Sequence, residues 1–197
     1  MEIAHITKPH PETGLVNSKL GVWLFLASEV MLFGALFSSY IIMRIGSMSW
    51  PHGYTLLNVP LATVNTFALI SSSVTIVLAW ASLKLNDFGK FRMYMTGTIA
   101  LSFVFLVIKY FEYTAKFEHG LYPSTNTFLA IYFTMTGLHA LHMIIGVGLM
   151  CVITWMAWKG KFSSEWYTPV EMSGLYWHFV DIVWIFLFPL LYLIDRS

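Results

Sequence analysis

Six acidic or histidine side chains interrupt apolar stretches of this 197-residue sequence, and their types could support proton transfer or metal binding; they are Glu29, Glu112, His139, His142, His178 and Asp181. Glu29 lies in the apolar run 20–43, which at about 1.5 Å per residue is long enough to cross the roughly 30 Å of bilayer hydrocarbon. Its carboxyl group is then about 13 Å from the nearer end of the helix. It must be protonated, paired with another group or wetted by a local cavity. We interpret it as functional; the alternative is a neutral acid hydrogen-bonded to a neighbouring helix.

Two histidines three positions apart, His139 and His142, share a face of the apolar segment 127–156. As metal ligands they would need further partners, for which the other four ionisable residues are the candidates. As haem ligands they could not bind opposite faces of one iron from one helix, so each would need its own haem. We favour a third interpretation, in which they belong to a hydrogen-bonded structural network between helices.

The other ionisable residues also form local pairs. Lys109 and Glu112 are three positions apart, so they can pair and lower each other's cost of burial. The alternative is an interfacial anchor, in which the lysine snorkels and the glutamate is solvated. Asp181 follows His178 by three positions and can fix its tautomer or neutralise a proton on it.

The composition sets the class of protein that must position these groups. The chain is 57% hydrophobic and 11% charged, against about 25% charged residues in typical soluble domains. This predicts a polytopic membrane protein with one bundle domain. The net charge of +1 gives no electrostatic case for nucleic-acid binding. The single cysteine, Cys151, excludes an internal disulfide and a Cys-x-x-Cys site.

Five apolar segments predict five membrane-spanning helices, at about 20–43, 60–83, 93–113, 127–156 and 174–194. The expected fold is an all-α, five-transmembrane-helix bundle over residues 20–194. The preceding segment 1–19 holds charges and no apolar run, so we do not expect a cleavable signal peptide.

An odd number of spans places the two termini on opposite sides of the membrane. Seven cations fall on the side of the N-terminus: Lys8, Lys19, Lys84, Lys90, Arg92, Lys159 and Lys161. Four fall on the other side: Arg44, Lys109, Lys116 and Arg196. The positive-inside rule therefore predicts a cytoplasmic N-terminus and an outside C-terminus, with Glu29 in the cytoplasmic half.

Small and aromatic residues predict where helices pack. The pairs Gly34 with Ser38 and Ala35 with Ser39 have the spacing that allows close helix approach. In the segment 60–83, a seam of small and hydrogen-bonding side chains recurs at helical spacing: Asn65, Ala68, Ser72, Thr75 and Ala79. We interpret this seam as a packing surface. Trp177 and Trp184, seven positions apart, form an aromatic stripe that is more typical of packing or lipid contact than of a cofactor site.

Several motifs together resemble subunit III of the haem–copper terminal oxidases. They are 25–33 (FLASEVMLF), Asn65-Thr66 with Ser71–Ser73, Glu112-Tyr113, 133–146 (FTMTGLHALHMIIG) and 176–184 (YWHFVDIVW). They run in the family's order from about residue 14 to residue 194. The chain resembles the short bacterial form with five helices, which lacks the first two helices of the mitochondrial form. It departs from the family at Ala140, where glycine is usual, and at Lys109, where glutamine is frequent.

The resemblance implies a function that the residues alone do not reveal. Subunit III binds no haem or copper itself, so those cofactors are expected in the partner subunits I and II. It packs beside the catalytic subunit I near the entrance of a proton-uptake path, protects it from inactivation during turnover and holds phospholipids in a cleft between groups of helices. Glu29 corresponds to the family's carbodiimide-reactive carboxyl. The other five residues map onto an intramembrane polar network that could take up protons or bind lipid headgroups. The implied location is the bacterial inner membrane.

Other functions remain open at this point. The same fold could serve a quinol oxidase or a nitric oxide reductase complex. An independent proton-coupled transporter would use Glu29, His139, His142 and Asp181 as its site, but it predicts internal repeats and broken helices that five spans do not offer. A stand-alone enzyme is weaker, because no nucleophile–base pair, phosphate loop or complete metal set can be assembled from the motifs.

Overall fold

The computed structural model describes residues 17–163 and 166–194, and in that part of the chain it contains helices and no strand. Five long helices are apolar enough to cross a membrane. The elements are α1 (Asn17–Gly46), the short α2 (Gly53–Leu56), α3 (Val59–Lys84), α4 (Phe88–Glu118), α5 (Thr127–Trp158), α6 (Thr168–Phe188) and the π-helical turn η1 (Pro189–Leu193). The predicted all-α, five-helix fold is confirmed. Most of the segment 1–19 lies outside the described residues, so its cytoplasmic location stays a prediction.

The helices extend beyond the apolar segments from which they were predicted. Helix α4 begins five residues earlier than expected because Asp87 caps it, accepting a hydrogen bond from the Lys90 backbone N–H at 3.1 Å. That N–H and the Lys90 ammonium group hold the pKa of the Asp87 carboxyl below its ordinary value. Helix α6 begins at Thr168 with Pro169 in its first turn, where the missing proline N–H has no cost. Polar first and last turns are invisible to a search for apolar windows.

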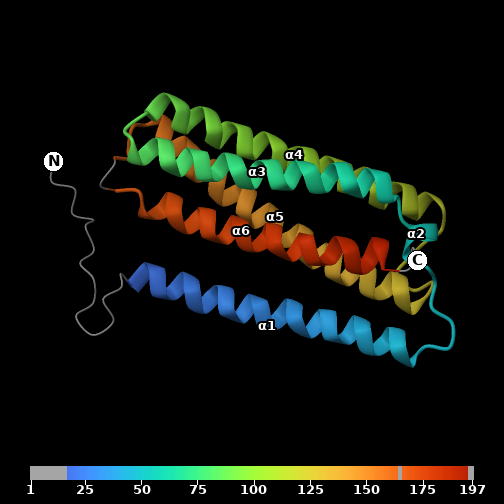
Figure 1. Ribbon diagram of the computed structural model, residues 1–197. Helices are drawn as coiled ribbons and strands as arrows, with labels where there is room; N and C mark the ends of the chain where they lie inside the picture. The colour runs from blue at the N-terminus through green and yellow to red at the C-terminus, as the bar shows by residue number, and fades with distance from the viewer. Residues whose placement is uncertain (1–16, 164–165, 195–197) are drawn as a thin grey trace.

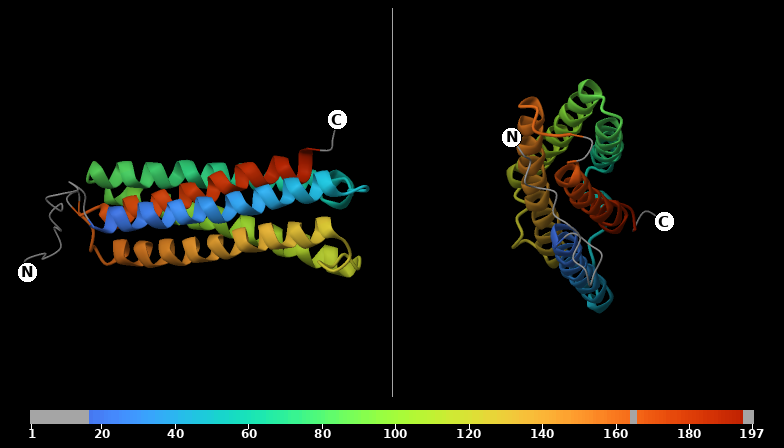
Figure 2. Two further views of the ribbon diagram at one scale, coloured as in Figure 1. Left: turned by 90° about the horizontal axis from the view of Figure 1, so that it is seen from below. Right: turned by 90° about the vertical axis from the view of Figure 1, so that its left-hand side faces the viewer.

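The five long helices form a bundle in which α1 stands to one side (Figure 1). Helix α3 packs along α4 and α6, and α5 packs along α4 and α6, so these four helices share one core. The main neighbours of helix α1 are α5 and α6, which it contacts sparsely, and the end-on view shows it at the edge of the arrangement (Figure 2). In the most apolar 18-residue window of α1, only 11% of the residues are buried inside the molecule.

The predicted polar seam on α3 is a packing surface. Trp177 Nε1 donates to the Ser72 hydroxyl at 3.0 Å, and Trp184 Nε1 donates to the Thr66 hydroxyl at 2.9 Å. Both indole side chains are fully buried, so the aromatic stripe faces the core rather than lipid. The small residues of α1 behave differently: a Cβ atom at Gly34 would meet nothing within 4 Å. No close approach of another described helix therefore depends on Gly34.

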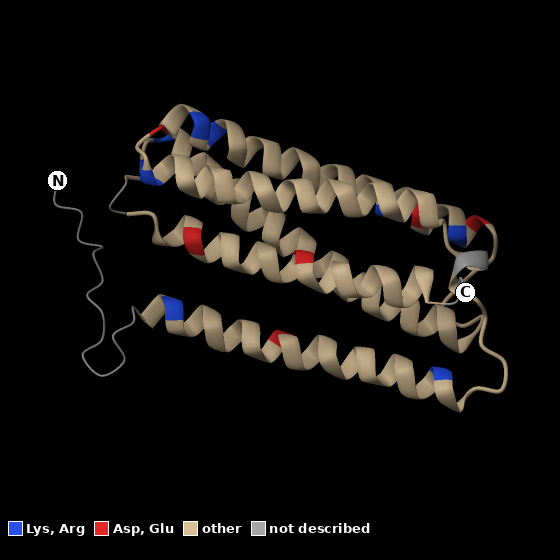
Figure 3. Cartoon of the chain, in the orientation of Figure 1, with Lys and Arg blue, Asp and Glu red and all other residues tan. Residues whose placement is uncertain are grey.

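Charged residues gather near the two ends of the helices, with a few acidic residues at positions between them (Figure 3). The end where α1 begins carries six described cations: Lys19, Lys84, Lys90, Arg92, Lys159 and Lys161. At the other end, Arg44 in the last turn of α1 is partly exposed, whereas Lys109 and Lys116 are buried, at 5% exposure each. The positive charge available to water is therefore concentrated at the end that holds the start of α1.

Candidate functional site

Glu29 pairs with His142 across the interface between α1 and α5. The Oε2 atom of Glu29 lies 2.9 Å from Nε2 of His142, and the two side chains are 14% and 10% exposed. The other ring nitrogen, Nδ1, lies 2.8 Å from the Leu138 backbone carbonyl. Of the three environments predicted for Glu29, the structure shows the paired one.

The contacts of His142 determine how many protons this pair holds. A backbone carbonyl can only accept, so Nδ1 of His142 must carry a hydrogen. The hydrogen bond to Glu29 then requires one further proton between Nε2 and Oε2. Either Glu29 is a neutral acid that donates to a neutral imidazole, or a carboxylate accepts from an imidazolium. In both forms the pair is electrically neutral, and losing the shared proton would set two acceptors against each other.

The pair lies in a mostly aromatic setting that fixes its position. The Phe33 ring meets the His142 ring edge-on, with 5.3 Å between centroids. The Tyr176 hydroxyl donates to the His142 backbone carbonyl at 3.0 Å. Elsewhere α1 is attached by few polar contacts: Lys19 bonds to Glu171 at 2.9 Å near one end, and the Tyr40 hydroxyl donates to the Leu190 carbonyl at 3.1 Å near the other. The Glu29–His142 bond is the polar attachment in the middle of α1.

His139 does not join this hydrogen-bonded network, contrary to the prediction. It is 1% exposed, and neither ring nitrogen has a hydrogen-bond partner among the described residues. Its ring stacks on Trp184 at 5.2 Å and receives the edge of Phe105 at 5.7 Å. Side chains three residues apart on a helix point in directions that differ by about 60°. That difference is enough to direct His139 toward α4 and α6 while His142 reaches α1.

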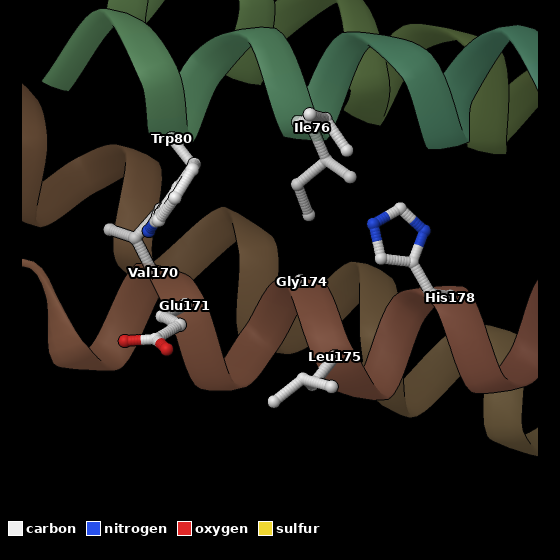
Figure 4. Close-up of a pocket in the computed structure, with 8 residues that line it drawn as sticks. Ile76, Trp80, Val170, Glu171, Gly174, Leu175 and His178 are labelled. Carbon is white, nitrogen blue, oxygen red and sulfur yellow. The ribbon is translucent and has the colours of Figure 1, made fainter. Parts of the chain in front are cut away.

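The predicted pairing of His178 with Asp181 is also wrong. Nδ1 of His178 lies 2.6 Å from the Ser73 hydroxyl on α3. Asp181 is 4% exposed, and neither carboxylate oxygen has a hydrogen-bond partner in the described part of the chain. Figure 4 shows the His178 ring pointing from α6 toward α3, whereas the Glu171 carboxylate points away from α3. Two small adjoining cavities, of about 200 and 310 Å³, share His178 as a lining residue.

Glu112 is the centre of a buried ionic cluster, which confirms the pair with Lys109 and overturns the interfacial alternative. Lys109 Nζ bonds to Oε2 at 2.7 Å, and Lys116 Nζ approaches Oε1 at 3.3 Å. Hydroxyl groups of Tyr132 and Tyr192 also donate to Oε1, at 3.0 and 2.8 Å. The Glu112 side chain is 3% exposed, so the carboxylate is held by protein groups rather than by water.

The six candidate residues therefore do not form one site. They divide into the Glu29–His142 pair, the packed His139, His178 with its contact to Ser73, the buried Asp181 and the Glu112 cluster. Within the described residues, no three His, Cys, Asp or Glu side chains lie close enough together to hold a metal ion. Of these groups, only Glu29 and His142 form a hydrogen-bonded acid–base pair among the described residues.

Several functional contacts were missed from the sequence. Lys116 follows Glu112 by four positions, a spacing that could have signalled its place in the cluster. Tyr132 and Tyr192 come from α5 and η1, and Ser73 comes from α3; nothing in the local sequence signals these partners. They depend on how the helices are rotated about their axes.

An apolar groove runs between α1, α5 and α6 near the end where α1 begins. Its volume is about 580 Å³, and its lining includes Val22 and Phe25 of α1, Leu149 and Val152 of α5, and Tyr176 of α6. The groove exists because α1 contacts the bundle at few points. Its apolar lining suits an acyl chain better than a polar substrate.

Comparisons with known proteins give one consistent result. The family model described as cytochrome c oxidase subunit III matches residues 4–195. A cytochrome c oxidase subunit 3 from Thermostichus vulcanus is 38% identical over 178 residues, which cover 90% of this chain and 87% of that protein. The protein of the same name from Corynebacterium diphtheriae is 38% identical over 179 residues, covering 89% and 87%. A heme-copper oxidase subunit I+III from Aeropyrum pernix is 32% identical over 180 residues, covering 88% of this chain and 22% of that longer protein.

Proposed function

This chain belongs to the cytochrome c oxidase subunit III family, an accessory subunit of haem–copper oxidases, and we propose that it stabilises the catalytic subunit, binds phospholipid and assists proton uptake. The observation that carries the proton role is the hydrogen bond between Glu29 and His142, whose other ring nitrogen contacts the Leu138 carbonyl. The family assignment accounts for the motifs that carried the resemblance. The chain is a multi-pass membrane protein.

The partner we propose is subunit I of the oxidase, with subunit II in the same complex. The relative named subunit I+III supports this choice, because 22% of its length aligns with this chain and its printed name joins the two subunits. We assign haem and copper to these partner subunits. The dispersed positions of His139, His142 and His178 support that assignment, since each belongs to a different helix interface.

For the proton role, we propose that the Glu29–His142 pair acts as an auxiliary proton buffer rather than an obligatory relay. The concentration of exposed cations at the end where α1 begins supports a cytoplasmic location for that end. Glu29 would then lie in the half of the bacterial inner membrane from which an oxidase takes up protons. In the structure the pair holds one shared proton, and it can release that proton only when water or another acceptor reaches it.

For the lipid role, we propose that the groove between α1, α5 and α6 holds a phospholipid acyl chain. Its apolar lining and its volume of about 580 Å³ support this. The Lys19–Glu171 ion pair joins the same helices near that end of the bundle and offers both charges to a headgroup. A lipid in this position would fill the space that the sparse packing of α1 leaves.

The test is affinity purification in mild detergent through a tag on this chain, followed by a visible spectrum and an oxygen-consumption assay. We expect haem absorbance and oxygen uptake to copurify with the chain. The donor that supports uptake, cytochrome c or quinol, then identifies the type of oxidase. A folded but colourless chain that purifies alone would contradict the proposal and favour the independent transporter.

A further inference from the structure

The Glu112 cluster contains more positive charge than negative charge. One carboxylate faces two buried ammonium groups, those of Lys109 and Lys116, and the other two partners, Tyr132 and Tyr192, are neutral hydroxyl donors. A buried cation without an equal anion is costly, so such a surplus normally has a partner. The cluster therefore has capacity for one more negative charge.

Lys116 is the cation with unused hydrogen-bonding capacity. Lys109 donates to Glu112 at 2.7 Å and to Tyr192 at 2.8 Å. Lys116 makes one long hydrogen bond of 3.3 Å, to a carboxylate oxygen that already accepts from two tyrosines, and its Nζ atom lies 5.3 Å from the centre of the Tyr132 ring. An ammonium group has three donors. At 5% exposure, Lys116 has donors left that bulk water does not freely satisfy.

Lys116 also lines a cavity of about 370 Å³ at this end of the bundle, a volume within the usual range of about 300–1,000 Å³ for ligand sites. Asn58, Glu112 and His119 are its other polar lining residues, and apolar side chains such as Leu61 and Phe111 complete it. Glu112 already has its partners, so it adds little repulsion. Glu118, although close in sequence, is exposed and does not line the cavity.

The cavity lies where a headgroup would be in a membrane. Lys116 is in the last turn of α4, and Asn58 is the N-cap of α3, so two membrane-spanning helices end there. The positive end of the α3 dipole faces the same region and favours an anion. Toward the membrane centre, Val64 on α3 and Val107 on α4 are 57% and 50% exposed, so apolar surface lies deeper along the same two helices.

We propose that this cavity is a phosphate-binding site, in which Lys116 and His119 hold the phosphate of a phospholipid headgroup or a free phosphate ion. The phosphate supplies the negative charge that the cluster lacks, and the Lys116 donors satisfy its oxygens. The site is at the opposite end of the bundle from the α1–α5–α6 groove. It does not depend on the role proposed for Glu29.

The test compares how the wild type and its variants bind phosphatidylglycerol. Each tagged protein is purified in mild detergent together with the subunits that assemble with it, is delipidated, and is examined by native mass spectrometry. Lys116→Met removes the charge, Lys116→Arg retains it, and Lys90→Met is the matched control at the other end of α4. We expect Lys116→Met to weaken phosphatidylglycerol binding about fivefold, whereas Lys116→Arg and Lys90→Met bind as the wild type does. Equal thermal midpoints establish that the variants are folded.

Competition with inorganic phosphate shows whether the site binds a phospholipid headgroup or a free phosphate ion. If millimolar phosphate displaces the Lys116-dependent lipid, or binds only to proteins that retain a cation at position 116, free phosphate is a ligand of the site. If phosphate has no effect on the Lys116-dependent component, the site is specific for the lipid. Equal lipid and phosphate binding by wild type and Lys116→Met, or an equal loss in Lys90→Met, would overturn the proposal.

Discussion

Glu29 and His142 share one proton because the Leu138 carbonyl fixes a hydrogen on the opposite ring nitrogen. Glu29→Gln keeps the hydrogen bond, since its amide donates to the neutral Nε2 atom, but it removes the exchangeable proton. We expect the oxidase to assemble and its thermal midpoint to change by no more than about 2–4 °C. Turnover should fall by less than about tenfold, equivalent to about 1.4 kcal/mol.

The control for this prediction is Glu29→Leu, which leaves Nε2 of His142 without a partner in a nearly buried position. An unsatisfied group of this kind costs about 1–3 kcal/mol, so this variant should lower the thermal midpoint where Glu29→Gln does not. A correctly assembled Glu29→Gln complex without any oxidase activity would show that the carboxyl is an obligatory relay rather than a buffer.

His139 and His142 differ in their partners, and the difference predicts opposite results for the same substitution. His139 has two unsatisfied ring nitrogens between Trp184 and Phe105, so His139→Phe should leave stability unchanged or raise it. His142→Phe breaks the bonds to Glu29 and to Leu138 and should destabilise the protein by about 1–3 kcal/mol. Thermal unfolding in detergent measures both. A destabilised His139→Phe protein would indicate that ordered water bridges His139 to other groups.

At the scale of helices, two glycines on α5 differ in their surroundings: Gly146 packs closely against another helix, and Gly148 faces open space. A Cβ atom at Gly146 would lie 2.9 Å from the Trp177 ring and 3.1 Å from Tyr176, whereas at Gly148 it would meet nothing within 4 Å. Gly146→Ala must therefore displace the buried Trp177 ring or separate α5 from α6, at a cost of about 1–3 kcal/mol. Gly148→Ala should be neutral or stabilising by up to about 1 kcal/mol, because alanine favours the helix.

Thermal midpoints of the two alanine variants, measured side by side, check the α5–α6 contact. The Gly146 variant should also weaken the Glu29–His142 bond, since the Tyr176 hydroxyl donates to the His142 carbonyl. If both variants had the same midpoint as the wild type, the close approach of α5 and α6 would not be a source of stability.

A pairing between neighbours on one helix could be predicted from the sequence, whereas contacts between different helices could not. Lys109 and Glu112 pair as expected because positions three apart on a helix are neighbours whatever the rest of the chain does. The His178–Asp181 pair failed although its spacing is the same, because Ser73 on α3 is a closer partner for His178. In a membrane bundle the lipid-facing sides are as apolar as the core. Hydrophobic periodicity therefore predicts that a helix forms, but does not predict which side of it faces which neighbour.

At the scale of the whole molecule, α1 is the least integrated part of the bundle, and it carries Glu29. It contacts α5 and α6 along one edge and leaves an apolar groove beside them. Its outward side exposes residues such as Leu24, Met31 and Ile42, at 65%, 76% and 70%. A proton-holding group on a lightly packed helix can respond to lipid and to neighbouring subunits more readily than one in the core.

The orientation of the molecule determines which aqueous phase lies nearer to Glu29, and it can be tested directly. The background is Cys151→Ser, which removes the single cysteine of the chain. Ser49→Cys places a thiol at the end where α1 finishes, and Lys161→Cys places one at the end where α1 begins; both positions are exposed. The positive-inside rule predicts that a membrane-impermeant maleimide labels Ser49→Cys in intact cells and labels Lys161→Cys only after permeabilisation. The reverse pattern would place Glu29 nearer the outer face, and the proposed assistance to proton uptake from the cytoplasm would then be wrong.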